Sequence, residues 1–550
     1  GAQTWSSAVN LGADLTLAGS GVTLASTVNG AHALIIADSG ATTLGGAIGG
    51  SAALTSVTVS STGGTALNGG VITTGGTQTY NNAITLGANT TLTGAGITLG
   101  ATVNGAKTLT IADSGTTYVN GAIGATTALS SLTVNSDNGT RINGGSISTS
   151  GNQKFDDAVT LGANTTLSGQ AIEFVSTVNS VANGQSTLSV SGNGVATFGA
   201  AVGEAVGGTG KLGSLSVTST GGAVINGGKV STIGSQSYAS AVTLGADTML
   251  SGAGITLGAT VDGVTGTQVA LTIVDLGATA INGTIGGSTP LTNLIVGSVN
   301  GTTLSGGGVT TTDSQTYSNA VTLGANTTLT GSDITLGATV NGAKSLTIAD
   351  SSATLINGAI GGSTPLTSVT IGSANGTTIN GGFVTTTGLQ TYGNAVTLGA
   401  DTDFAGNTIS LQSTIDGAHA LGIDDAGTTT LTGAVGAGTA LASVSIDAQS
   451  MQFSAITSAT HGNASGNVSL TSATALQLGH LDVAGALTVT TGSSGAGGVT
   501  QAPNATLVVN GNAAFVADTA QGQQATLNNA GNDFRGTLAF REANNGSWLD

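Results

Sequence analysis

One phrase recurs six times along the chain, and this repetition limits the possible folds more than any other feature. Residues 78–94 read QTYNNAITLGANTTLTG and residues 315–331 read QTYSNAVTLGANTTLTG. The six copies open at nearly even intervals, at Gln3, Gln78, Gln153, Gln236, Gln315 and Gln390. Self-similarity at a nearly fixed period predicts a repeat architecture in which each unit packs on its neighbours.

Within each copy, apolar residues alternate with Thr or Ser. Ile84 and Leu86 flank Thr85, and the segment 108–113 repeats the pattern as TLTIAD. Alternation over a few residues, bounded by Gly and Asn, predicts short half-buried strands. Because no stretch shows the 3.6-residue period of a helix, we expect an all-β chain.

Asn-Gly and Gly-Gly pairs separate the expected strands. Such pairs supply positive φ at low steric cost and often form hairpins. Here they recur at equivalent places in successive copies, with Asn before Gly-Gly at Asn68, Asn143, Asn226 and Asn380. Recurrence at fixed places favours a solenoid over hairpins. We therefore predict a right-handed parallel β-helix with about three coils, each of about 25 residues, in every repeat unit of about 75 residues.

The low charge of the chain agrees with this stacking. Equivalent residues of successive coils lie about 4.8 Å apart in a parallel solenoid, where like charges repel. Only 6% of the 550 residues are charged, whereas Thr, Ser, Asn and aliphatic residues stack on their own kind without repulsion. We expect columns of Val, Ile and Leu inside and hydrogen-bonded Asn ladders at the turns.

Two regions are expected. Residues 1–440 hold six units, starting near 3, 78, 153, 236, 315 and 390, and residues 441–550 continue the solenoid with shorter, divergent coils. Extra residues at 179–186, 203–213 and 262–270 should form loops while the strands keep register. Because the pattern is already under way at both ends, we expect a segment of a longer protein.

Composition excludes several functions. The net charge of −17 comes from 8 basic and 25 acidic residues, so no basic patch is available for nucleic acid. The absence of cysteine excludes disulfides and thiolate metal sites. No apolar run reaches the roughly 18 residues that a transmembrane helix needs.

Carboxylates follow an apolar strand in five of the six units and are the best candidates for a metal site. They are Asp38, Asp113, Asp275, Asp350 and Asp424. Calcium needs six to eight oxygens at about 2.3–2.6 Å, whereas equivalent positions three coils apart are separated by about 14 Å. We expect these residues to cap strand ends through Asx turns.

Other titratable residues give no catalytic pattern. His32 and His419 occupy a position held by Lys107 and Lys344 in other units, which indicates a solvated turn. The adjacent pairs Asp156–Asp157 and Asp424–Asp425 point to opposite faces of a strand. The remaining candidates are scattered: His461, His480, Glu173, Glu204, Glu542, Arg141, Arg535 and Arg541. We predict no enzyme and no catalytic, cofactor-binding or metal site.

Several phrases carry a family resemblance: AVTLGANTTLTG at 320–331, LTIADSG at 109–115, GNVSLTSATALQLG at 466–479, GALTVTTG at 485–492 and ATLNNAGNDFRGTL at 525–538. The chain resembles the repeat region of filamentous-haemagglutinin-like adhesins of two-partner secretion and autotransporter type. The resemblance implies a right-handed parallel β-helix, export through an outer-membrane transporter, an extracellular or cell-surface location, and a role in attachment, aggregation or biofilm.

We therefore expect the stalk of an exported bacterial adhesin, with a glycan or protein as ligand. The loops at 179–186 and 203–213 are better candidates for binding than the uniform walls. One alternative is a self-assembling matrix or filament protein, favoured by flat, nearly uncharged walls. Another is a Thr-array ice-binding solenoid, which would need Thr-X-Thr at one place in every coil.

Overall fold

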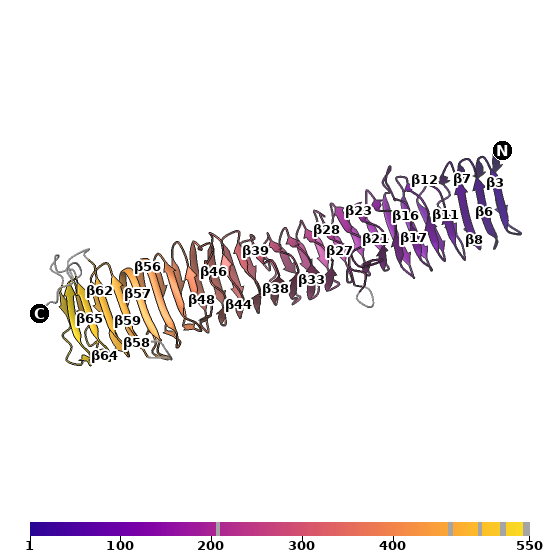
Figure 1. Cartoon of the computed structure of the whole chain (residues 1–550). Helices are drawn as coiled ribbons and strands as arrows, with labels where there is room; N and C mark the ends of the chain where they lie inside the picture. The colour runs from indigo at the N-terminus through magenta and orange to yellow at the C-terminus, as the bar shows by residue number, and fades with distance from the viewer. Residues whose placement is uncertain (205–208, 460–465, 493–497, 518–523, 543–550) are drawn as a thin grey trace. The chain divides into compact units, whose positions relative to one another are not determined.

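The computed structural model describes residues 1–204, 209–459, 466–492, 498–517 and 524–542. Within these ranges the chain forms strands and no helix, and it divides into two compact units, residues 1–282 and 283–550. Each unit is a stack of short parallel strands (Figure 1). The described residues form about 25 turns of about 21 residues each. The prediction of an all-β parallel solenoid is confirmed.

Most turns contain three strands, one for each face of the solenoid, and in some turns a single bridging residue such as Ile123 takes the place of one strand. In the first unit one turn holds β11 (Gln78–Tyr80), β12 (Ile84–Leu86) and β13 (Thr90–Gly94), and the next holds β14 (Ile97–Leu99), β15 (Val103–Asn104) and β16 (Thr108–Asp113). Each strand of the first of these turns pairs in parallel with the strand one turn later, β11 with β14, β12 with β15 and β13 with β16. The repeat continues with β17 (Thr117–Val119), β18 (Ser131–Ser136), β19 (Thr140–Ile142) and β20 (Ser146–Ser148).

The turns are shorter than the sequence analysis predicts, and the repeat is not a whole number of turns. Gln78 lies beside Ile97, the same column continues through Thr117 to Thr140, and Thr140 lies beside Val159. The phrase itself returns at Gln153, before the fourth turn is complete. Each repeat therefore spans about three and two-thirds turns of about 21 residues.

Successive copies of the phrase consequently lie on different faces. The opening strands are β1 (Gln3–Trp5), β11, β21 (Gln153–Phe155), β31 (Gln236–Tyr238), β41 (Gln315–Tyr317) and β51 (Gln390–Tyr392). In the first unit β21 stacks on the column of β13, not on that of β11. The predicted three coils in every repeat unit would place the six phrases over one another, and this is wrong. The strands β1 and β31, three repeats apart, share one column, while β11 and β21 lie on the other two faces.

The interior is filled by the apolar residues of each alternating strand. Leu92, Ile97 and Val103 have no exposed surface, and outward neighbours such as Thr91 and Thr98 are half-buried. A fully buried Leu, Ile or Val contributes about 1.5–3 kcal/mol, and the columns repeat this in every turn. The core also holds large aromatic side chains: Tyr80, Tyr238, Tyr317, Tyr392, Phe155, Phe174, Phe198, Phe404 and Phe515.

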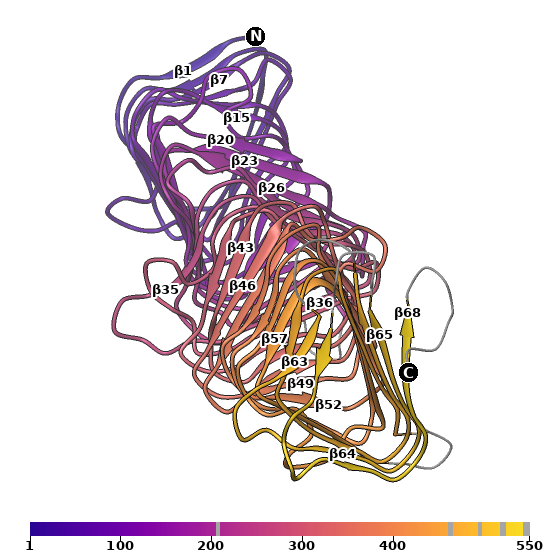
Figure 2. The same cartoon turned by 90° about the vertical axis from the view of Figure 1, so that its left-hand side faces the viewer.

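The extra residues leave the register of the strands intact, as predicted. Thr165 still pairs with Leu188 across the insertion at 179–186, and Thr248 pairs with Leu271 across the insertion at 262–270. The loop at 262–270 follows β35 (Val261–Gly263) and stands out from the stack (Figure 2). The insertion at 203–213 includes residues 205–208, which lie outside the described residues.

In the second unit, parallel pairing continues beyond the last copy of the phrase. The strands there include β56 (Ala420–Leu431), β57 (Ser443–Phe453), β59 (Val468–Ser472), β62 (Leu487–Thr491) and β65 (Ala513–Ala517). Val468 pairs with Leu487, and Leu487 pairs with Ala513. The second of these turns is longer than the first, so the turns in this region vary in length. Within the described ranges, no helix is long and apolar enough to cross a membrane.

Candidate functional site: buried polar clusters and outward columns

A buried glutamine opens five of the six copies of the phrase and connects neighbouring turns, whereas Gln3 in the first copy is half-buried. Gln78 has no exposed surface. Its Nε2 donates hydrogen bonds to the carbonyl oxygens of Ile72 (3.1 Å) and Thr93 (2.7 Å), and its Oε1 accepts the hydroxyl of Tyr80 at 3.0 Å. The same hydroxyl-to-Gln bond recurs from Tyr238, Tyr317 and Tyr392 at 3.1–3.2 Å. Because buried polar atoms need partners, the Gln and the aromatic residue two positions later form one structural element.

The third copy departs from this arrangement. Phe155 replaces Tyr, and Oε1 of Gln153 has no hydrogen-bond partner. The Phe155 ring instead stacks on Phe174 at 5.3 Å, and Phe174 stacks on Phe198 at 5.6 Å. The first copy has Trp5 at this place. In the remaining four copies, burial raises the pKa of the Tyr hydroxyl, so it remains a protonated donor.

The strand-end aspartates are structural, as the Asx-turn prediction stated. Asp113 is 2% exposed and accepts backbone N–H bonds from Gly96 (2.6 Å), Ile97 (2.8 Å) and Gly115 (2.8 Å), and the Thr117 hydroxyl at 2.9 Å. Two of these bonds reach the preceding turn, so the carboxylate holds turns together as well as capping a strand. Four protein donors leave little room for a cation among its oxygens.

The same arrangement recurs at Asp38, Asp275, Asp350 and Asp425. The prediction of Asp424 at this position is therefore wrong. It pairs with outward-facing Ala405, and Asp425 takes the buried place because it pairs with Gly406. At Asp38, burial opposes ionisation, but hydrogen bonds from Gly40, Val22 and Thr42 outweigh it and lower the pKa of the carboxyl group.

Asparagine and aspartate are interchangeable at the turn that ends in Leu-Gly-Ala-Asn or Leu-Gly-Ala-Asp. Oδ1 of Asn89 accepts the backbone N–H of Thr108 at 3.1 Å, and Oδ1 of Asp247 accepts that of Ala270 at 2.9 Å. Another turn forms the expected Asn ladder: Nδ2 of Asn143 donates to Oδ1 of Asn120 at 2.7 Å. Asn380 and Asn357 repeat this ladder at 2.8 Å.

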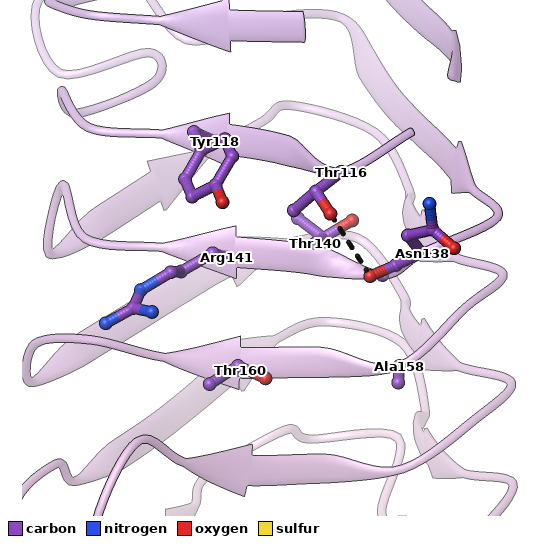
Figure 3. A pocket seen from close by; sticks show the side chains of 8 residues that line it. Thr116, Tyr118, Asn138, Thr140, Arg141, Ala158 and Thr160 are labelled. Carbon is purple, nitrogen blue, oxygen red and sulfur yellow. Dashed lines mark hydrogen bonds between the residues drawn. The ribbon is translucent and has the colours of Figure 1, made fainter. Parts of the chain in front are cut away.

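One outward column of the first unit carries an aromatic ring and a cation. Tyr118, Arg141 and Thr160 lie on successive strands and line a shallow depression of about 180 Å³ (Figure 3). Tyr118 is 40% exposed, and Nε of Arg141 donates to Oδ1 of Asn143 at 3.3 Å. The depression is open and holds a single charge, so it shows no catalytic arrangement.

A second depression, of about 380 Å³ in the second unit, is acidic. Asp403, Asp424 and Asp447 line it, and Asp424 pairs directly with Asp447 on the neighbouring strand. Like charges at this spacing repel. Among the described residues, no group of three or more His, Cys, Asp or Glu side chains is arranged to hold a metal ion.

His32, His419 and His480 lie apart from one another. His32 and His419 are 37% and 38% exposed at their side chains, with Nδ1 atoms 3.6 and 3.5 Å from Oδ1 of Asp14 and Asp401. This exposure agrees with a solvated turn. Nδ1 of His480 lies 2.6 Å from the Thr506 hydroxyl.

Among the other candidates, Glu204, at the start of the insertion at 203–213, forms an ion pair with Lys229, and Arg535 forms one with Asp533. His461 and the side chain of Glu542 lie outside the described residues.

Outward threonines form single columns. In the second unit Thr328, Thr347, Thr370, Thr391, Ser410 and Thr430 follow one another on one face. The adjacent column does not match, because Thr330 is followed by Ala349 and Gly372. A Thr-X-Thr pair therefore does not persist from turn to turn on this face.

Comparison with known proteins adds one match. A family model described as repeats of unknown function (DUF5649) matches residues 465–541. The comparisons with curated proteins and with solved structures found no match. The matched segment covers the last strands of the second unit, including β59, β62 and β65.

Proposed function

We propose that this chain is the structural stalk of a secreted or cell-surface bacterial adhesin, which holds a binding region away from the cell. The observation that carries the proposal is the recurrence of one internal scaffold. The buried Gln–Tyr bond is present in four copies and the buried Asp cluster in five.

Such a scaffold supports a spacer because it fixes the strand spacing in every turn. Solenoid stability is approximately a sum of the turns and the contacts between neighbours, so repeats can be added without redesign of the core. The outward side chains vary from turn to turn, as Thr98, Tyr118 and Arg141 do along one column. The resemblance to exported adhesins supports an extracellular location and passage through an outer-membrane transporter.

The test is deletion of one repeat, residues 78–152, from the protein in its native cells. The junction places Gln153 where Gln78 stood, so every strand keeps a partner of the same kind. At about 4.8 Å per turn, the deletion shortens the stack by about 18 Å. A spacer role predicts normal surface display and attachment that declines as successive repeats are removed. Attachment that ignores length, or that disappears with one particular repeat, contradicts the proposal.

Self-association of stalks is a second candidate, favoured by apolar side chains on the walls. Leu276 is 69% exposed, Val299 64% and Ile233 51%. Isolated exposed apolar residues are common on proteins, so the test must be direct. Light scattering over a range of protein concentrations will show higher-order species if the walls associate, and a constant monomer mass if they do not.

A further inference from the structure

The turn that ends in Leu-Gly-Ala-Asn carries an amide group that the fold does not use. In three copies the residue is Asn89, Asn164 or Asn326, and its Oδ1 accepts a backbone N–H from the next turn at 3.0–3.1 Å. In the other three copies Asp14, Asp247 and Asp401 accept the equivalent bond at 2.9 Å. A carboxylate therefore does the same structural work as the amide.

The Nδ2 atoms of these three asparagines make no hydrogen bond within the described part of the chain, and all three residues are exposed. The hydrogen bond to Oδ1 fixes the side chain and leaves Nδ2 toward solvent. The fold therefore gives no reason for an amide at this position. A reason must come from outside the packed structure.

The residue two positions later supplies that reason. Thr91, Thr166 and Thr328 follow the three asparagines, and none of the intervening residues is proline. Asn-X-Ser or Asn-X-Thr, with X other than Pro, is the acceptor sequence for N-linked glycosylation, and these three copies carry the Thr form. In the copies with Asp, the corresponding residues are Thr16, Met249 and Asp403.

We propose that Asn89, Asn164 and Asn326 are N-glycosylation sites. A separate transferase would bring an activated sugar with a phosphate leaving group at its anomeric carbon. The Nδ2–C1 bond forms, the C1–O bond to phosphate breaks, and a base of the transferase takes one Nδ2 proton. The inference does not depend on the stalk role.

Three other Asn-X-Thr sequences differ in a way that separates them from these sites. Asn138, Asn300 and Asn375 precede Gly-Thr, but their threonines are buried, and Thr140 donates to the Ser136 hydroxyl at 3.5 Å. At the proposed sites Thr166 and Thr328 are exposed and Thr91 is half-buried. A transferase acting on the folded turn can therefore reach Asn and Thr together at the proposed sites but not at these three.

Two further sequences, Asn282-Gly-Thr and Asn504-Ala-Thr, have half-buried threonines. For Asn282, no other copy carries Asp at the equivalent place. Asn120 and Asn357 occupy the equivalent place in two other copies. In the second sequence, the Thr506 hydroxyl already lies 2.6 Å from Nδ1 of His480. The proposal therefore concerns the Leu-Gly-Ala-Asn turns alone.

The proposed sites also differ in direction. Asn89 immediately precedes β13 and Asn164 immediately precedes β23 (Thr165–Gly169), and these strands belong to different sheets. Sugars on the first unit would therefore cover different corners of the solenoid, which suits a surface that has few charges to keep it hydrated.

The experiment is peptide mass spectrometry on the protein purified from the cells that naturally make it. We expect glycan mass on peptides with Asn89, Asn164 and Asn326, and none on peptides with Asp14, Asp247 and Asp401. Recovery of all three asparagines unmodified would overturn the proposal. So would modification confined to Asn138, Asn300 and Asn375.

Two variants separate loss of the acceptor from loss of the fold. Asn89→Asp keeps the Oδ1 acceptor, as at Asp247, and should lose one glycan with an unchanged circular dichroism spectrum. Thr91→Ala should also lose the glycan at Asn89 although the Asn remains. The control is Thr110→Ala. Thr110 pairs with Thr91 on the next turn, but the residue two positions before it is Thr108 and not an Asn. Loss of the glycan in this control would refute recognition of the acceptor sequence.

Discussion

The bond between the Tyr80 hydroxyl and Oε1 of Gln78 gives the sharpest test of the internal scaffold. Replacing Tyr80 with Phe removes the donor and leaves a fully buried oxygen without a partner. Such an atom costs about 1–3 kcal/mol. The opposite change, Phe155→Tyr, should supply the donor that Oε1 of Gln153 lacks. We expect it to stabilise the third copy by about 1 kcal/mol.

The assay should be local because long repeat arrays need not unfold in a single step. Native-state hydrogen exchange of peptides that cover residues 72–99 measures the opening of the turns around Tyr80. A loss of about 1–3 kcal/mol corresponds to exchange roughly 5- to 150-fold faster in Tyr80→Phe. Phe155→Tyr should slow exchange in peptides around 147–174 by roughly fivefold.

The controls are available in the same chain. Tyr118 is 40% exposed on an outward column, and Tyr118→Phe should change stability by less than about 0.5 kcal/mol. The ring of Phe155 stacks on Phe174, whereas Tyr80, Tyr238, Tyr317 and Tyr392 pair with Leu one turn later. Adding Phe174→Leu to Phe155→Tyr reproduces that environment. The reasoning is refuted if Tyr80→Phe resembles Tyr118→Phe, or if neither Phe155→Tyr nor the double variant gains protection.

Three further predictions concern the Asp clusters and a turn glycine. Asp113→Asn places an amide donor against four donors and should destabilise the chain by about 2–3 kcal/mol in urea titrations, whereas Asn at exposed Asp137 should be nearly neutral. Because the pKa of Asp38 is lowered in the folded state, its ionised carboxylate stabilises the fold at pH values above the pKa that the group has in the unfolded chain. The free energy of unfolding, measured in urea at several pH values, should therefore fall as the pH drops below about 4. It should fall less steeply in Asp38→Asn. Gly105→Ala should cost about 2 kcal/mol or more in thermal melts because φ is +125° and a Cβ would lie 2.4 Å from the Leu86 carbonyl oxygen, while Gly12→Ala, with no atom within 4 Å, should be tolerated.

Much of the fold could be predicted from the sequence because its determinants are local. Alternation places Leu92 inside and Thr91 outside in any half-buried strand. The Asx turn of Asp113 and the ladder of Asn143 on Asn120 follow from side chains that reach backbone or copies nearby. The loops at insertions were predictable because strand columns leave no room for extra residues.

The length of a turn and the face of each phrase were not predictable in the same way. They depend on where the three corners of each turn fall within a repeat unit, and the alternation of Ile84 and Leu86 carries no information about those positions. Gln78 was visible as the start of each phrase, but its role depends on the carbonyl oxygens of Ile72 and Thr93. These lie 6 and 15 residues away in the sequence and come together only after coiling. The regular appearance of Tyr two residues later was the available signal.

The candidate sites divide along the same line. The buried Asp clusters were predicted as caps, but Asp424 was chosen instead of its neighbour Asp425. The alternation itself identifies Asp425, because Leu421, Ile423 and Asp425 repeat the pattern of Leu109, Ile111 and Asp113. The amide of Asn89 gained meaning only when the structure showed that Asp247 makes the same bond.

The fractional number of turns per repeat has a consequence for how such a gene can change. Unequal recombination that removes or adds one copy keeps every strand paired, yet it swings whatever follows by roughly a third of a circle about the stacking axis. Only a gain or loss of three copies restores the original bearing, as Gln3 and Gln236 show within the first unit. Variation in copy number would thus reorient a distal region as well as change its distance.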